Sequence, residues 1–220
     1  MEVTTQPSMV TFITMVMQLK VRFRRGWLSS GISEVDCEKV SCHSWGLSLL
    51  SFFFIEDKTL DAKRMAQMAI VHDLAEAIVG DITPSDSIPK AQKKLLELDA
   101  MKKICSACPD KSVAELILNL FEEYETDETK ESQICHDLDK LEMLFTAYSY
   151  ERGLRCQNER KALNLQTTPL QNEQEHARAD AIDLNEFFLS CRGKIRDERC
   201  QQWYLEILQA RTGATQLDEP

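Results

Sequence analysis

The chain has 220 residues, 43% of them hydrophobic and 28% charged, so it is long enough to bury a core and has the composition of an ordinary globular protein. Its formal net charge of -10 argues against a nucleic-acid or anionic-membrane partner, because an acidic surface repels phosphates, but a small phosphorylated substrate stays open. Only 7 glycines and 6 prolines occur, which favours long helices over a strand-rich fold.

Hydrophobic periodicity predicts helices along most of the chain. They are expected at about 10–21, 38–55, 61–80, 90–105, 111–124, 132–150 and 180–211, the last one interrupted near Gly193. The first would present Val10, Ile13, Met17 and Val21 on one face and is interpreted as a core helix. The polar segment 152–179 is predicted to be a long loop. We therefore predict an all-α fold with one compact bundle at 10–211 and flexible ends at 1–9 and 212–220.

The cysteines and the N-terminal segment indicate in which cellular compartment the protein is expected. No secretory leader is apparent, so reduced thiols are expected for the eight cysteines, and the lone Cys105-x-x-Cys108 is interpreted as a structural helix end. The basic cluster at 20–25 follows the apolar residues 9–17, which is the wrong order for a secretory signal, and no apolar stretch reaches membrane-spanning length. We expect a cytoplasmic protein, with a mitochondrial presequence left open.

The segment 71–81 offers several polar functional groups within an otherwise apolar helix. On a helix His72 and Glu76 are one turn apart and project together, and Asp73 lies about a third of a turn from His72. Asp81 follows the helix-ending glycine and can turn back toward the same spot. Because an unpaired acid among apolar residues is costly, this grouping favours a shared metal ion.

A His-Asp dipeptide is weak evidence by itself, since the chain has a second one, His136-Asp137, which we interpret as a solvated helix surface. A metal also needs ligands from elsewhere. His43 lies in an otherwise apolar helix, where a lone histidine is more often a satisfied core residue than a ligand. Asp139 lies beside core positions, where a carboxylate needs a partner that Lys140 could also provide. The residues alone leave both assignments open.

The ordered pattern of His43, His72-Asp73 and Asp139 resembles the HD superfamily of metal phosphohydrolases, and more narrowly its 5'-deoxynucleotidases and the HD domain-containing protein 2 group. The resemblance covers roughly residues 10–210, with matching stretches at 18–20, 26–27, 38–43, 71–81, 88–90, 121–125 and 138–143. It implies an HD-domain helical bundle and a homodimer. It also implies that the four residues hold one divalent ion, and it selects Asp139 over Asp137.

Further roles follow from the same resemblance. Glu76 and Asp81 match the acids that act on the substrate phosphate or the attacking water, with no division of roles between them. Arg25 or Arg24 matches a phosphate-contacting arginine, and we assign Arg25. Trp27 matches an aromatic residue near the nucleoside.

The donor set indicates the chemistry. Two imidazoles and two carboxylates suit Mn²⁺, Co²⁺, Fe²⁺ or Zn²⁺ better than Mg²⁺, and such an ion can polarise a phosphoryl group and lower the pKa of water. The hypothesis is hydrolysis of (deoxy)nucleoside 5'-monophosphates. The alternatives are the same site acting on another nucleotide phosphoester, or a helical binding module with a vestigial site. Cys42 keeps the latter open, because the family usually has an acid there.

Overall fold

The computed structural model describes residues 6–152 and 182–213, which contain helices and, apart from an isolated antiparallel bridge between Phe23 and Lys39, no β-structure. The α-helices are α1 (Met9–Val16), α2 (Arg25–Ser29), α3 (Val40–Leu50), α4 (Ala62–Val71), α5 (Glu76–Val79), α6 (Lys90–Ala107), α7 (Lys111–Thr126), α8 (Lys130–Glu151), α10 (Asn185–Cys191) and α11 (Glu198–Thr212). Short 3₁₀ helices lie at η1 (Met17–Lys20), η2 (Ser51–Phe54) and η3 (Pro84–Asp86). The all-α prediction is confirmed.

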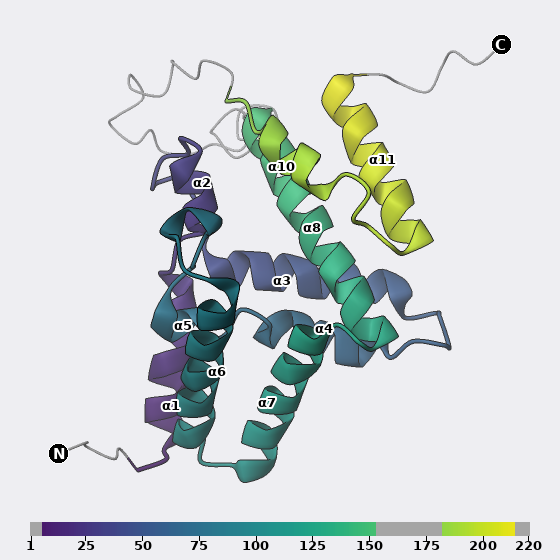
Figure 1. Cartoon of the computed structure of the whole chain (residues 1–220). Coiled ribbons are helices and arrows are strands. Elements are labelled where there is room, and N and C mark those ends of the chain that lie inside the picture. The colour runs from purple at the N-terminus through teal and green to yellow at the C-terminus, as the bar shows by residue number, and fades with distance from the viewer. Residues whose placement is uncertain (1–5, 153–181, 214–220) are drawn as a thin grey trace, which may run out of the picture.

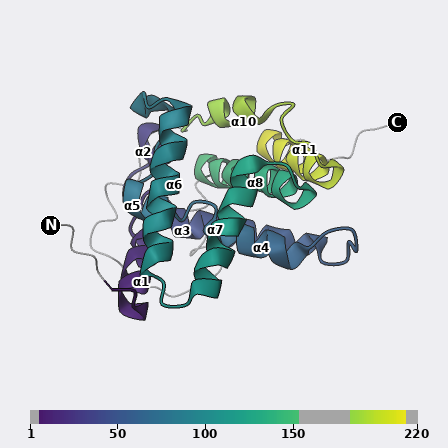
Figure 2. The same ribbon diagram turned by 60° about the horizontal axis from the view of Figure 1, so that its bottom comes forward.

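Two groups of helices meet at a central pair (Figures 1 and 2). Helix α1 packs against α6 and α6 against α7, while α10 and α11 both pack against the long helix α8. The central helices α3 and α4 pack against each other, and both contact α8. The loop predicted at 152–179 lies, beyond Arg152, outside the described residues, as do most of the predicted flexible ends.

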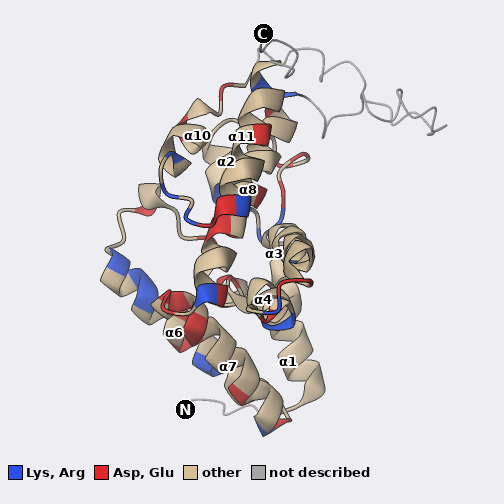
Figure 3. Cartoon of the chain, turned by 90° about the vertical axis from the view of Figure 1, so that its right-hand side faces the viewer, with Lys and Arg blue, Asp and Glu red and all other residues tan. Residues whose placement is uncertain are grey.

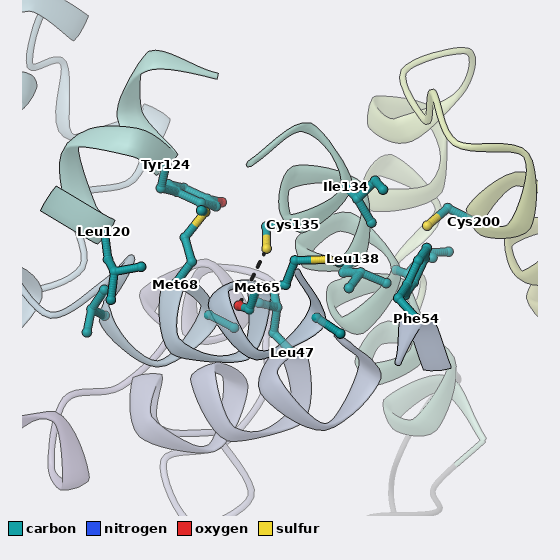
Figure 4. Close-up of a cluster of buried hydrophobic side chains, with 14 of the residues drawn as sticks. Leu47, Phe54, Met65, Met68, Leu120, Tyr124, Ile134, Cys135, Leu138 and Cys200 are labelled. Carbon is teal, nitrogen blue, oxygen red and sulfur yellow. Dashed lines mark hydrogen bonds between the residues drawn. The ribbon is translucent and has the colours of Figure 1, made fainter. Parts of the chain in front are cut away.

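The largest core cluster fixes the position of α4. Leu47 of α3, Met65 and Met68 of α4 and Leu138 of α8 are completely buried and pack together (Figure 4). Truncating one such side chain to alanine typically costs about 2–5 kcal/mol, because the cavity collapses only partly. Packing on α3, α7 and α8 therefore holds the C-terminal end of α4 in place.

The predicted helix at 61–80 is in fact two helices joined by tighter turns. Asp61 caps its start, accepting the backbone N–H of Arg64 at 2.9 Å. Between α4 and α5 the backbone hydrogen bonds join residues three apart. For example, the backbone N–H of Glu76 donates to the Asp73 carbonyl at 3.0 Å. In such a winding residues i and i+3 eclipse each other. The segment is therefore not the continuous α-helix on which the predicted alignment of Glu76 with His72 rests.

The face predicted for the first helix is the exposed one. Val10 is 77% and Val21 61% exposed, whereas Phe12, Met15 and Leu19 pack against the core. Apolar residues surround almost the whole circumference of this segment, so its periodicity could not distinguish the buried face from the exposed one.

The second His-Asp dipeptide is not a solvated surface. Asp137 is completely buried, and its Oδ2 accepts the backbone N–H groups of Arg196 at 2.7 Å and Asp197 at 2.8 Å. His136 Nε2 lies 2.9 Å from the carbonyl oxygen of Tyr124. Asp137 thus anchors the connection between α10 and α11 to α8, a long-range partnership that neighbouring residues could not reveal.

The cysteines of the described ranges are all free thiols. The interpretation of Cys105 and Cys108 as a helix end is confirmed, because α6 ends between them and the backbone N–H of Cys108 donates to the Cys105 carbonyl at 3.1 Å. Within the described parts of the chain, no helix has the length and apolar character that crossing a membrane requires.

Candidate metal centre

Four predicted ligands converge where α3, α4 and α8 meet. His43 lies in the first turn of α3, His72 and Asp73 directly follow α4, and Asp139 lies in the middle of α8. Asp73 Oδ2 is 3.2 Å from His72 Nε2 and 3.9 Å from His43 Nε2. Asp139 Oδ1 approaches the same His43 nitrogen at 3.1 Å. The structure therefore brings together side chains that are separated by almost a hundred positions.

The imidazole nitrogens that face this point fit a metal ion. His43 Nε2 and His72 Nε2 are buried and neither makes a well-aligned hydrogen bond, which is unusual for buried polar atoms. Their other ring nitrogens are engaged, His43 Nδ1 with Glu142 Oε2 at 2.5 Å and His72 Nδ1 with the Ala69 carbonyl at 2.8 Å. Ligand atoms about 2.1 Å from one ion and at right angles lie roughly 3 Å apart, close to the spacing seen here.

The charges of the cluster also favour a cation. Burial raises the pKa of Asp73 and of Asp139, but the neighbouring imidazoles outweigh burial and hold both pKa values below the ordinary range. Burial and the Arg24 charge lower the pKa of His43, yet the carboxylates of Asp139 and Glu142 raise it to about 10. The carboxylates of Asp73, Asp139 and Glu142 thus gather negative charge around the imidazoles, and a divalent ion can balance it.

Glu76 and Asp81 border the centre on the side of α5. Glu76 is 5% exposed, and its Oε2 has no hydrogen-bond partner. Burial, followed by the charges of Asp73 and Asp81, raises the pKa of Glu76 to about 10. Asp81 is half-buried, and its Oδ2 accepts the backbone N–H of Arg25 at 2.5 Å. Glu76 is therefore a sequestered carboxyl group beside the ligands, whereas Asp81 is tied to the start of α2.

Of the two candidate arginines, Arg24 lies beside the cluster. Its side chain is 17% exposed, with Nη1 3.5 Å from Asp73 Oδ2. Its backbone N–H donates to the Glu38 carbonyl at 3.0 Å, which holds this segment against the start of α3. The Arg25 side chain is 51% exposed and pairs with Asp86 at 2.9 Å. The placement favours Arg24 over the assigned Arg25.

The structure does not bring Trp27 to the cluster. Its side chain is 2% exposed and packs in a separate core, with its ring centroid 5.4 Å from that of Tyr150 and 4.4 Å from that of Phe187. The position does not support the predicted contact with a nucleoside, and a structural role accounts for the burial.

Two residues that support the ligands were missed by the sequence reasoning. The Tyr124 hydroxyl donates to Asp139 Oδ2 at 2.9 Å, and the Tyr124 ring lies against the ring of His72, with centroids 4.9 Å apart. Glu142 meets the Nδ1 of His43. Both residues fall within the matching stretches 121–125 and 138–143, so a signal existed. Spacing alone, however, does not say which polar residues of a helix turn inward.

Comparison with known proteins agrees with this architecture. Residues 16–183 match the model of the HD domain, and the chain belongs to the HD-domain family. It is 40% identical over 144 residues to the 5'-deoxynucleotidase HDDC2 of Danio rerio, covering 66% of this chain and 70% of that protein. It is 36% identical over 148 residues to the 5'-deoxynucleotidase hdd1 of Schizosaccharomyces pombe, covering 66% and 73%. The predicted resemblance is confirmed.

Solved structures share the fold. The PH0347 protein from Pyrococcus horikoshii OT3 superposes with a TM-score of 0.65 at 26% identity, covering 94% of this chain and 100% of that one. The HD domain-containing protein YGK1 superposes with a TM-score of 0.60 at 20% identity, covering 93% and 85%, which bears on the fold alone.

Proposed function

We propose that this chain is a metal-dependent phosphohydrolase that removes the 5'-phosphate from (deoxy)nucleoside 5'-monophosphates. The observation that carries the proposal is the pair of buried Nε2 atoms of His43 and His72, which make no well-aligned hydrogen bond and face the carboxylates of Asp73 and Asp139. The similarity to 5'-deoxynucleotidases supports the substrate class. The mixed nitrogen and oxygen donors support Mn²⁺, Co²⁺, Fe²⁺ or Zn²⁺ rather than Mg²⁺.

The chain's own residues have distinct tasks in this proposal. A divalent ion held by the four ligands would polarise the phosphoryl group and acidify the attacking water. Arg24 would hold a phosphate oxygen through charge-assisted hydrogen bonds. Glu76 would take or return the proton at the attacking water or the leaving 5'-oxygen. Asp81 would keep the start of α2, and with it Arg24, against the centre.

The test is phosphate release from a panel of ribo- and deoxyribonucleoside monophosphates. Chelated protein reloaded with Mn²⁺, Co²⁺, Zn²⁺ or Mg²⁺ is expected to release phosphate only when loaded, and to favour the deoxy substrates. The unloaded protein is the control. If protein that binds one metal per chain released no phosphate from any member, the proposal would fail in favour of another phosphoester or a binding module.

The binding-module alternative has little structural support. The side chains proposed as ligands are close to one another, because Asp73 lies near both imidazoles and Asp139 lies near that of His43. Cys42, the residue that departs from the family pattern, has an exposed side chain on α3, whereas the adjacent His43 is completely buried. The replacement of an acid by Cys42 therefore leaves the grouping of the ligands intact.

Replacing each arginine in turn should separate their roles. Arg24→Ala is expected to lower kcat/KM by about 10- to 100-fold, since hydrogen bonds to charged groups contribute roughly 1.5–3 kcal/mol. Arg25→Ala, the matched control, removes the ion pair with Asp86 and a hydrogen bond to the Asp81 carbonyl, both outside the ligand cluster, and should stay within a few fold of the wild type. Steady-state kinetics on one deoxynucleoside monophosphate measures both. A larger loss of kcat/KM in Arg25→Ala than in Arg24→Ala would make Arg25 the phosphate ligand.

We also propose a homodimer, in keeping with the family resemblance. Large apolar side chains are exposed on α3, the following 3₁₀ helix and α8, among them Trp45 at 64%, Phe53 at 67% and Phe145 at 57%. Helix α3 carries no Lys, Arg, Asp or Glu, and its ribbon is tan (Figure 3). Patches of this kind usually mark interfaces. Light scattering should give twice the chain mass of 25.3 kDa, and a value of one chain mass would refute the dimer.

A cytoplasmic location and the absence of nucleic-acid or membrane partners complete the proposal. The free thiols of the described ranges and the net charge of -10 support it. Localisation of a tagged full-length chain by microscopy is the direct check, and a mitochondrial pattern would overturn it.

A further inference from the structure

The ring of His43 lies between two carboxylates that come from the same helix. Asp139 and Glu142 are three residues apart on α8 and so project from one face of it. Asp139 Oδ1 lies 3.1 Å from Nε2 of the ring, and Glu142 Oε2 lies 2.5 Å from Nδ1. His43 itself is completely buried, so water cannot substitute for either contact.

The two nitrogens of His43 therefore have different tasks. A neutral imidazole carries one proton, and the nitrogen without it is the one that can donate a lone pair to a metal. With the ring proton on Nδ1, donated to Glu142, the lone pair on Nε2 faces Asp73 and Asp139. With the proton on Nε2 instead, the ring could not ligate at that position. The contact with Glu142 thus selects the tautomer that a metal needs.

Glu142 in turn has close neighbours on two helices. Its Oε1 lies 3.2 Å from the Thr146 hydroxyl, one turn further along α8, and the same hydroxyl lies 3.2 Å from Glu38 Oε2. On the facing helix, Gly46 leaves room for the side chain, because a Cβ there would lie 3.1 Å from both Cγ and Oε1 of Glu142. A glycine inside a helix is unfavourable by itself, so the close approach of Glu142 explains this one.

We propose that Glu142 is a positioning residue, which fixes the tautomer and orientation of His43 so that its Nε2 faces the metal. The inference rests on the metal centre of the proposed function. Outer contacts of this kind typically change metal affinity by about 10- to 100-fold when they are removed.

The experiment measures metal affinity rather than turnover. Glu142→Leu removes the acceptor, and we expect its Kd for Co²⁺ and Zn²⁺, determined by competition with a chromogenic chelator, to rise about 10- to 100-fold. Glu142→Gln keeps an oxygen that can accept the Nδ1 proton and should recover most of the affinity. Ile134→Ala, a core truncation on the same helix, is the control for lost stability alone and should bind metal like the wild type.

A second measurement covers the case in which Glu142→Leu does not fold. In the Zn²⁺-loaded protein labelled with ¹⁵N, the Nδ1 proton of His43 should resonate downfield and exchange slowly, and Glu142→Gln should move it upfield. Unchanged affinity of Glu142→Leu, or an unmoved resonance in Glu142→Gln, would overturn the positioning role. His43→Ala separates this failure from a failure of the proposed function: if that variant also kept full affinity, the metal centre itself would be wrongly assigned.

Discussion

Asp73→Ala is expected to remove the bound metal and to lower the rate of phosphate release by at least about 10³-fold. The Oδ2 atom of Asp73 is shared between the two imidazoles, at 3.2 Å from His72 Nε2 and 3.9 Å from His43 Nε2. Its loss leaves the ion with one fewer charged ligand. Because polarisation by a metal supplies several kcal/mol and each 1.36 kcal/mol is tenfold in rate, the effect should be large. Elemental analysis of the purified variant and a phosphate-release assay measure both quantities.

The second His-Asp dipeptide provides the matched control. Asp137→Ala makes the same substitution in the other His-Asp dipeptide. There the carboxylate accepts two backbone N–H groups of the connection between α10 and α11. We expect a loss of about 2–4 kcal/mol in unfolding free energy, measured with urea, and one metal per folded chain. A variant of Asp73 that kept its metal and activity, or a variant of Asp137 that lost its metal, would show the site assignment to be wrong.

The choice between Asp137 and Asp139 shows what the sequence could and could not predict. Residues two apart on a helix point to different sides, so Asp137 faces the α10–α11 connection while Asp139 faces His43. Both sides of α8 are buried by partners distant in sequence, and the local pattern therefore looked alike for the two acids. The resemblance to a family selected Asp139 as the predicted ligand, whereas hydrophobic periodicity predicted only that both acids lie on a helix.

The arginines illustrate a different limit. Arg24 is the extended residue before α2, and Arg25 is the first residue of that helix, so their side chains leave in different directions. The isolated β-bridge that places Arg24 beside α3 joins residues from two segments and has no signature in either one. The tight turns between α4 and α5 could not be predicted from the sequence either. A sequence window long enough to detect helical periodicity is much longer than the four residues over which the winding changes.

Glu76→Gln is expected to lower kcat by about 10²- to 10⁴-fold while one metal per chain remains bound. Glutamine has nearly the same shape as glutamic acid but can neither take up nor release a proton, so the change isolates proton transfer from packing. The burial of Glu76 and the unpartnered Oε2 make it the acid best placed for this task. KM should change little, because the phosphate is held by Arg24 and the metal in the proposed arrangement.

The matched control is Glu97→Gln on α6, a partly buried glutamate that pairs with Lys93 at 3.5 Å and has no place in the mechanism. The Glu97→Gln variant should keep the wild-type kcat and one metal ion per chain. Two results would revise the role of Glu76. Loss of the metal together with activity would make it a ligand in its own right, since Glu76 is close enough to Asp73 for the charge of that residue to raise its pKa. If Glu76→Gln kept the wild-type kcat, the proton-transfer role would be assigned to Asp81, the other acid at the centre. The hydrogen bond between Asp81 and the start of α2 would then be the lesser of its two roles.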